Sequence, residues 1–175
     1  LAQLRALGLT LGYLGLETGD EVVNERIVKG ASIDDQVRAV QRAQAAGIKM
    51  SVMVLLGMGG RDRTREHAIE TGKVVSRMDP RYISCLCVTP VPGTPLHEQV
   101  ESGTFEMITP EETLEELRLL VEHLDLSGAV FRSNHASNYL PLGGRLPVDK
   151  ERLLAAIAQA EAGEVPLKPE YLRGL

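Results

Sequence analysis

Aromatic residues and net positive charge are both scarce in this sequence. Its 175 residues include no tryptophan, four tyrosines and two phenylalanines, and the formal net charge is −5 at pH 7. Binding of nucleic acid needs a basic surface for the phosphates and, for single strands, aromatic side chains on which the bases stack. The composition provides neither, so a nucleic-acid partner is not expected.

Long apolar runs are also absent. No segment approaches the roughly 20 apolar residues of a membrane-spanning helix, and the N-terminal residues lack the basic and apolar pattern of a secretory signal. With 43% hydrophobic and 25% charged residues, the chain can bury one ordinary globular core. We therefore expect a single cytoplasmic domain without a membrane partner.

The chain has only two cysteines, Cys85 and Cys87, which lie in a segment typical of a strand. Side chains at alternate strand positions point the same way, about 6.6 Å apart at the backbone, and this geometry disfavours a disulfide. Two thiols at this spacing do not make a metal site either. We interpret both as buried, unreactive thiols and expect no metal ligand in this chain.

The first residues indicate a helix that is already under way. Leu1, Leu4 and Leu7 recur at helical spacing and Gly8 suits a helix end, so we expect a fragment of a longer protein. The expected organisation is one domain in three parts: the end of a preceding helix over residues 1–8, strand and helix units over 9–147, and a C-terminal helix and tail over 148–175.

Strand and helix patterns alternate along the chain. Four apolar segments read as strands: residues 13–16, 48–56, 82–89 and 129–133. The longest, 48–56, is typical of a parallel strand covered on both faces. Five segments read as helices: residues 20–30, 32–46, 61–78, 109–124 and 150–162. The clearest helix start is at Thr109, followed by Pro110 and then Glu112.

This alternation predicts an α/β fold with a parallel sheet and right-handed crossovers. Three or four such units amount to half of a TIM-like β/α barrel, and an open doubly wound sheet is the alternative. Both architectures bind ligands at the C-terminal ends of their strands. Four segments follow the expected strand ends: residues 17–29, 57–63, 89–96 and 134–142.

Each of the first three segments contains a distinctive motif. Glu17 ends a strand and Lys29 follows twelve positions later, in GLETGDEVVNERIVKG; a solvated turn and a helix-end cation are the plain alternatives. The glycines of LLGMGG either bring backbone N–H groups to a phosphate or form an ordinary turn. The prolines of TPVPGTPL make a rigid strand exit.

The order of these three motifs, over roughly residues 10–125, resembles the second half of the catalytic domain of the radical S-adenosylmethionine superfamily. The resemblance implies a partial parallel β/α barrel that holds a 4Fe-4S cluster and S-adenosylmethionine. In this family, reductive cleavage of that cofactor generates a 5′-deoxyadenosyl radical. The cluster ligands come from a C-x-x-x-C-x-x-C loop that this sequence lacks. The resemblance therefore places the ligands in a missing N-terminal half and implies that this fragment is inactive alone.

The resemblance also implies cofactor contacts at single positions. Glu17 matches a polar residue near the ribose. A carboxylate can accept hydrogen bonds from the two ribose hydroxyls. Lys29 matches a position that is often arginine and faces the carboxylate of the cofactor, although lysine is a less directional donor.

The later strand ends match the surroundings of adenine. Val54 and Gly57 correspond to an apolar wall and a glycine against which the base packs, and Thr89 and Pro90 also lie near it. Relatives commonly have a proline and a glycine followed by an acidic helix start, where this chain has residues 58–62, MGGRD. This departure leaves the contacts of that loop open.

The segment SNHASNYLPLGG, residues 133–144, concentrates hydrogen-bonding side chains after the last expected strand. It resembles the matching part of an uncharacterised subgroup of radical enzymes, and a folded turn is the plain alternative. Asn134, His135 and Asn138 are the candidate contacts to a small-molecule substrate, with His135 as a possible proton donor. The other histidines and the charged run 111–116 are interpreted as surface residues.

Two other function classes remain open. One is a nucleotide- or phosphate-binding barrel enzyme without radical chemistry, in which residues 57–63 hold the phosphate. The other is a non-catalytic interaction module whose exposed strand edges are covered by a partner.

Overall fold

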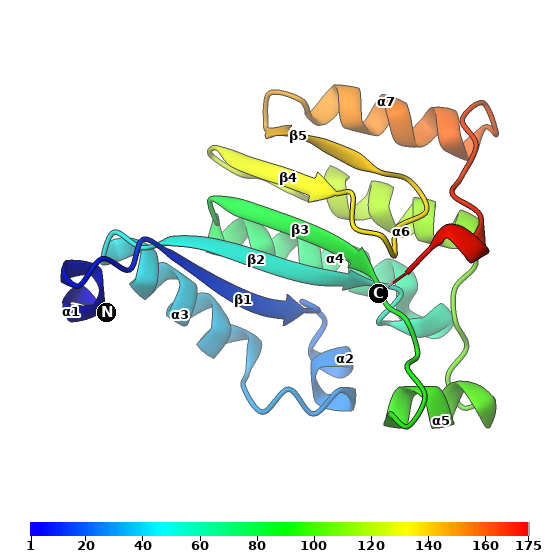
Figure 1. The fold of residues 1–175 in the computed structure, drawn as a ribbon, viewed down its shortest axis with the longest axis horizontal. Helices are drawn as coiled ribbons and strands as arrows, with labels where there is room; N and C mark the ends of the chain where they lie inside the picture. The colour runs from blue at the N-terminus through cyan, green and yellow to red at the C-terminus, as the bar shows by residue number, and fades with distance from the viewer. Residues whose placement is uncertain (175) are drawn as a thin grey trace.

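The repeated strands form one five-stranded sheet. The computed structural model describes residues 1–174, and Figure 1 shows the strands side by side. Their order follows the sequence: β1 (Leu11–Glu17), β2 (Lys49–Leu56), β3 (Tyr82–Cys87), β4 (Ala129–Ser133) and β5 (Leu142–Leu146). Pairing is parallel from β1 to β4 and antiparallel between β4 and β5. The predicted α/β class with a largely parallel sheet is confirmed, whereas β5 was missed.

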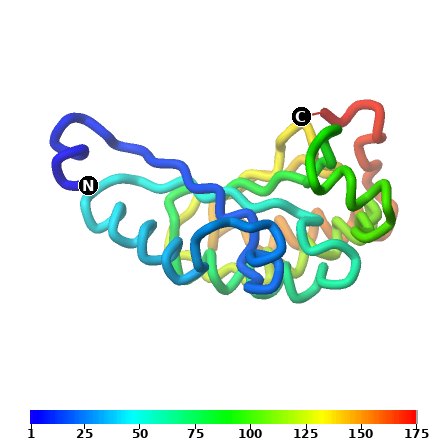
Figure 2. Tube along the Cα trace, turned by 90° about the horizontal axis from the view of Figure 1, so that it is seen from below, coloured from blue at the N-terminus to red at the C-terminus, as the bar shows by residue number. Residues whose placement is uncertain are grey.

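Helices follow most of the strands. They are α1 (Ala2–Ala6), α2 (Glu21–Arg26), α3 (Ile33–Ala45), α4 (Gly60–Met78), α5 (Pro95–Glu101), α6 (Pro110–Glu122), α7 (Lys150–Glu161) and the 3-10 helix η1 (Glu170–Leu172). Figure 2 shows α3, α4, α6 and α7 along one face of the sheet. No helix within residues 1–174 is long and apolar enough to cross a membrane.

The core lies between the sheet and this layer of helices. Along β3, Ile83, Cys85 and Cys87 are buried against the helices, while the alternate side chains Ser84 and Leu86 are half-buried on the other face. Strand β2 shows the same alternation from Val52 to its end. The expectation that residues 48–56 are covered on both faces therefore holds only for the first half of β2. Within residues 1–174, α3, α4, α6 and α7 all lie along the same face of the sheet.

Local capping explains where the two clearest helices begin. The hydroxyl of Ser32 accepts the backbone N–H of Asp35 at 3.1 Å before α3. At α6, the Thr109 hydroxyl accepts the N–H of Glu112 at 3.2 Å, and the Glu112 carboxylate accepts the N–H of Thr109 at 2.7 Å. Pro110 occupies the first turn, where a missing N–H costs nothing. The start at Thr109 is thus confirmed as a capping box.

We expect Thr109→Ala to lower the free energy of unfolding by about 1 kcal/mol, because it removes the acceptor for an N–H group at the start of α6. Urea denaturation would measure the loss. Glu111→Gln is the matched control, since Glu111 is exposed in the same turn and does not bond the cap. Equal losses for the two variants would contradict the capping role.

Candidate functional site

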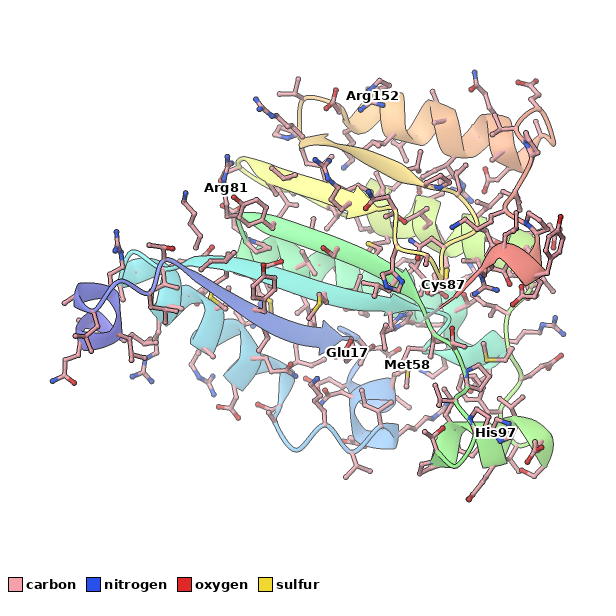
Figure 3. All side chains as sticks on the ribbon, in the orientation of Figure 1. Glu17, Met58, Arg81, Cys87, His97 and Arg152 are labelled. Carbon is pink, nitrogen blue, oxygen red and sulfur yellow. The ribbon has the colours of Figure 1, made fainter. Side chains whose placement is uncertain are left out.

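The parallel strands β1, β2 and β3 all end at the same edge of the sheet. In Figure 3, Glu17, Met58 and Cys87 mark this edge at the ends of these strands. Helices α2 and α5 and the C-terminal segment lie beside it (Figure 1). The motifs that are far apart in the sequence therefore meet in one region, as expected for parallel strands.

Glu17 and Lys29 form an ion pair at the end of β1. The Lys29 ammonium donates to Oε1 of Glu17 at 3.3 Å, and the two side chains are 27% and 24% exposed. The register of β1 against β2 shifts between Gly15 and Glu17, and Glu17 has a φ of 66°. Val28, next to Lys29, has a φ of 52°, which is rare for a β-branched residue. Such bulges and left-handed residues gather next to functional sites.

The turn after Glu17 is docked onto α4. The Thr18 hydroxyl lies 2.8 Å from Nδ1 of His67, and the N–H of Gly19 donates to the Thr71 hydroxyl at 2.8 Å. A Cβ on Gly19 would lie 2.5 Å from the Cα of Thr71, so only glycine allows this close approach. The turn therefore holds the end of β1 in one place.

Asp20 completes this turn as the N-cap of α2. One carboxylate oxygen accepts the N–H groups of Val22 and Val23, and the other accepts two hydrogen bonds from Arg63, at 3.0 and 2.8 Å. Burial alone would raise the pKa of Asp20, but the bonds from Arg63 and the two amides outweigh it, so the pKa lies below its ordinary value. The carboxylate is thus fixed in its charged form.

His67 and Glu116 form a buried pair behind the strand ends, and interpreting them as surface residues was wrong. They are 2% and 1% exposed, respectively. Nε2 of His67 lies 3.0 Å from the backbone oxygen of Leu55, which only accepts, so this nitrogen carries the hydrogen. The Glu116 carboxylate accepts the N–H of Gly57 at 2.7 Å and the hydroxyl of Thr64. Burial raises the pKa of Glu116. No local pattern signals this pair, because its members lie on α4 and α6.

Gly57, Thr89 and Pro90 line one cavity of about 230 Å³ between the ends of β2 and β3. Tyr139 and Arg173 border it too, and the Arg173 guanidinium lies 3.8 Å from the centroid of the Tyr139 ring. Three of the predicted cofactor residues are thus neighbours.

Val54, the fourth of these predicted residues near adenine, does not line this cavity. It is 1% exposed and belongs to the core under the helices. Its neighbour Leu55 is half-buried on the uncovered face. The apolar residue of β2 that lines the 230 Å³ cavity is Leu56, next to Gly57.

The loop between β4 and β5 divides its polar side chains between two environments. Asn134 and His135 are exposed, and Nδ1 of His135 accepts the N–H of Ser137 at 3.2 Å. Asn138 is 1% exposed; its amide donates to the Cys85 oxygen at 2.8 Å and accepts the Cys87 N–H at 3.1 Å. Asn138 therefore holds the loop against β3, while Asn134 and His135 remain open to a ligand.

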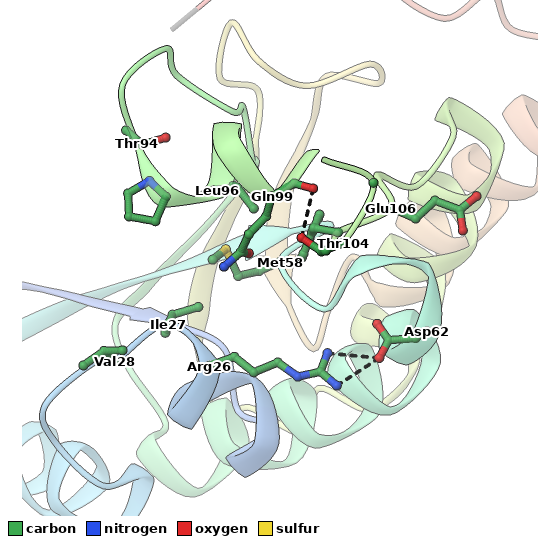
Figure 4. A pocket seen from close by; sticks show the side chains of 13 residues that line it. Arg26, Ile27, Val28, Met58, Asp62, Thr94, Leu96, Gln99, Thr104 and Glu106 are labelled. Atoms are coloured by element: carbon green, nitrogen blue, oxygen red, sulfur yellow. Dashed lines mark hydrogen bonds and ion pairs between the residues drawn. The ribbon is translucent and has the colours of Figure 1, made fainter. Parts of the chain in front are cut away.

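A larger cavity, about 890 Å³, lies between α2 and α5 (Figure 4). Val28, Met58 and Leu96 are among its apolar lining residues, and Arg26 closes one side through two bonds to Asp62, both 3.0 Å long. None of the predicted cofactor residues lines this cavity, although Val28 precedes Lys29 and Met58 follows Gly57. No local pattern in the sequence signals this cavity, because its walls come from four separate segments.

The cysteines are free and buried, as predicted. Burial raises the pKa of Cys87 to about 11 and that of Cys85 further, so both stay protonated at neutral pH. Metal ligation requires the thiolate. Within residues 1–174, no group of three or more His, Cys, Asp or Glu side chains could hold a metal ion.

The chain is similar to known proteins in sequence and in fold. No protein-family model matches the chain. It is 28% identical to the biotin synthase of Thermus thermophilus over 146 residues, which cover 82% of this chain and 42% of that protein. It is 27% identical to the biotin synthase of Synechocystis over 184 residues, covering 97% and 49% respectively. The chain thus spans less than half the length of the relatives it matches.

The fold has a solved counterpart. The structure of archaeal Methanocaldococcus infernus Elp3, with an N-terminal deletion, superposes with a TM-score of 0.62 at 19% identity, covering 94% of this chain and 39% of that one. Biotin synthase and Elp3 are both members of the radical S-adenosylmethionine superfamily. Sequence similarity and fold therefore confirm that this chain resembles the C-terminal half of the radical S-adenosylmethionine barrel.

We expect Gly19→Ala to destabilise the protein by about 1–3 kcal/mol, because its Cβ would meet the backbone of α4. Gly128→Ala is the control, since a Cβ there meets no heavy atom within 4 Å. Neither glycine has a positive φ, so the comparison isolates the contact. Thermal and urea denaturation would measure both, and similar stabilities for the two variants would refute the close approach.

We expect Glu116→Gln to change how stability depends on pH. A carboxyl whose pKa is raised by folding binds more protons in the folded state, so its contribution falls as pH rises above about 4.3, the ordinary pKa of glutamate. Above that pH, the free energy of unfolding of the wild type should fall relative to that of the glutamine variant. The fall is about 1.4 kcal/mol for each unit by which folding raises the pKa. Urea denaturation at several pH values measures this difference. Glu111→Gln, at an exposed position of the same helix, should track the wild type; parallel curves for all three proteins would contradict the prediction.

Proposed function

We propose that this chain is the C-terminal portion of a radical S-adenosylmethionine enzyme and that its strand ends hold one side of the cofactor. The observation that carries the proposal is the convergence of Glu17 and Lys29 in one ion pair at the C-terminal edge of the sheet, with left-handed backbone at Glu17 and Val28. Because the chain spans less than half of its relatives, the activity, substrate and partners of the whole protein are part of this proposal.

The residues present fit the cofactor. The Glu17 carboxylate has free acceptor positions for the ribose hydroxyls, and the Lys29 ammonium has two further hydrogens for a carboxylate beyond the one shared with Glu17. The 230 Å³ cavity beside Gly57, Thr89 and Pro90 is smaller than the roughly 300–1,000 Å³ of most ligand sites. It therefore suits one ring system, such as adenine, rather than the whole cofactor.

The 4Fe-4S cluster does not fit this chain. Cys85 and Cys87 are buried and protonated, and they are the only cysteines in the sequence. The cluster ligands belong to the N-terminal half of the barrel, which would pair with the free edge of β1. When S-adenosylmethionine binds at a reduced cluster, it supplies the radical; the residues of this chain would bind and orient the cofactor.

The substrate would be a small molecule that reaches the same edge from the loop after β4. Asn134 and His135 are exposed there, and Nε2 of His135 is available to a ligand because Nδ1 accepts the N–H of Ser137. Asn138 would support the loop through its bonds to β3. In this arrangement His135 would contact the substrate or donate a proton to it.

The phosphate-binding alternative finds little support in the loop after β2. A phosphate cradle needs free backbone N–H groups. The N–H of Gly57 donates to Glu116, that of Gly60 to the Gly57 oxygen, and that of Arg61 to the Glu106 oxygen.

The full-length protein that contains this chain, reconstituted with iron and sulfide without oxygen, should cleave S-adenosylmethionine to 5′-deoxyadenosine under strong reductant. Glu17→Ala and Lys29→Ala should each weaken cofactor binding by about 1–3 kcal/mol, because each removes hydrogen bonds to a charged group. Calorimetry would measure affinity and chromatography the product.

Glu25→Ala is the control for these variants, since Glu25 is exposed on α2 away from the ion pair. A wild-type protein that neither assembles a cluster nor forms 5′-deoxyadenosine would end the proposal. Unchanged affinity in Glu17→Ala and Lys29→Ala, with an active wild type, would instead remove these two residues from the site.

A further inference from the structure

Gly15 lies within β1, directly before the bulge, and its backbone conformation does not require glycine. The φ of Gly15 is not positive. A glycine in the interior of a strand also weakens that strand. A strand glycine without a backbone reason often marks the close approach of another group. The approaching group at Gly15 is the side chain of Glu17.

The carboxyl group of Glu17 occupies the space that a side chain at position 15 would fill. A Cβ on Gly15 would lie 2.1 Å from Oε1 of Glu17, 3.1 Å from its carboxyl carbon and 3.6 Å from Nζ of Lys29. Side chains two positions apart on a regular strand lie on one face but stay separate. The bulge and the left-handed φ of Glu17 bring the carboxyl back over Gly15 instead.

We propose that Gly15 is a positioning residue for the cofactor site, because its missing side chain sets where the Glu17 carboxylate lies and therefore where Lys29 meets it. This inference rests on the proposed function, in which that carboxylate accepts the ribose hydroxyls. The role belongs to the empty volume above Gly15, and no atom of Gly15 needs to touch the cofactor.

Alanine at this position separates positioning from folding. The three heavy atoms nearest to the added methyl group all belong to the ends of two flexible side chains, Glu17 and Lys29. The sheet can therefore keep its register while the carboxylate moves away and its 3.3 Å contact with Lys29 lengthens. A structural effect would lower the thermal stability, whereas a positioning effect leaves it unchanged.

Gly12→Ala is the matched control on the same strand. A Cβ there would lie 2.9 Å from the sulfur of Met50 and 3.4 Å from its terminal carbon, which is also a flexible side-chain end. The three heavy atoms nearest to that Cβ belong to Met50 and Ile48, and none belongs to Glu17 or Lys29. Both variants thus add the same methyl group to β1 next to the ends of unbranched side chains, the buried Met50 at position 12 and the pair Glu17 and Lys29 at position 15, so only Gly15→Ala disturbs the ion pair.

The test combines a crystal structure with binding of S-adenosylmethionine to the reconstituted full-length protein. In Gly15→Ala we expect the Glu17 carboxylate to leave the Lys29 ammonium, affinity to fall at least tenfold, and the melting temperature to stay that of the wild type. Gly12→Ala should retain wild-type affinity within twofold. A Glu17 carboxylate that keeps its place in the Gly15→Ala crystal structure would overturn the inference.

A double variant decides whether the effect passes through Glu17. In the Glu17→Ala background, Gly15→Ala should cause no further loss of affinity, because the displaced carboxylate is already gone. An equal loss in both backgrounds would show that Gly15 acts by another route. If the wild type does not bind S-adenosylmethionine, the proposed function fails, and the crystal structures still decide whether Gly15 places the carboxylate.

Discussion

The hydrogen bonds of His67 and Glu116 fix the edge of the sheet on which the rest of the site depends. His67 joins the turn after β1, through Thr18, to the end of β2, through the Leu55 oxygen. Glu116 joins Gly57, which directly follows β2, to α6. A buried carboxyl is costly unless its oxygens are bonded, and here donors from Gly57 and Thr64 satisfy them. Two strand ends and two helices are therefore held as one unit.

The one-sided layer of helices explains why this edge is accessible. The helices bury one face of the sheet, and the opposite face keeps half-buried side chains such as Met53, Leu55 and Leu86. A strand in a complete barrel has both faces covered. The uncovered face and the free edge of β1 agree with an alignment that spans less than half of the biotin synthases. Residues at the ends of β1, β2 and β3 therefore reach one region at this edge.

Local strain at this edge has a structural cause on each side of the ion pair. The turn residues Thr18, Gly19 and Asp20 are tied to α4, so β1 must end abruptly, and Glu17 takes a left-handed conformation there. After α2, Val28 turns the chain back and Lys29 reaches the carboxylate. The energy of these conformations is offset by the contacts with α4, which is how functional sites commonly retain strain.

The sequence by itself determined the order of strands and helices, the helix starts at Ser32 and Thr109, the buried state of the cysteines and the strand ends at which to look for a ligand. These features depend on periodicity, capping and neighbours a few residues away. Only the tertiary structure decided that Glu116 and His67 are buried, that Asn138 is tied to β3 and that β5 returns antiparallel beside β4. The partners in those contacts are roughly 50 residues apart in most cases and meet only when the sheet is assembled, so no local pattern records them.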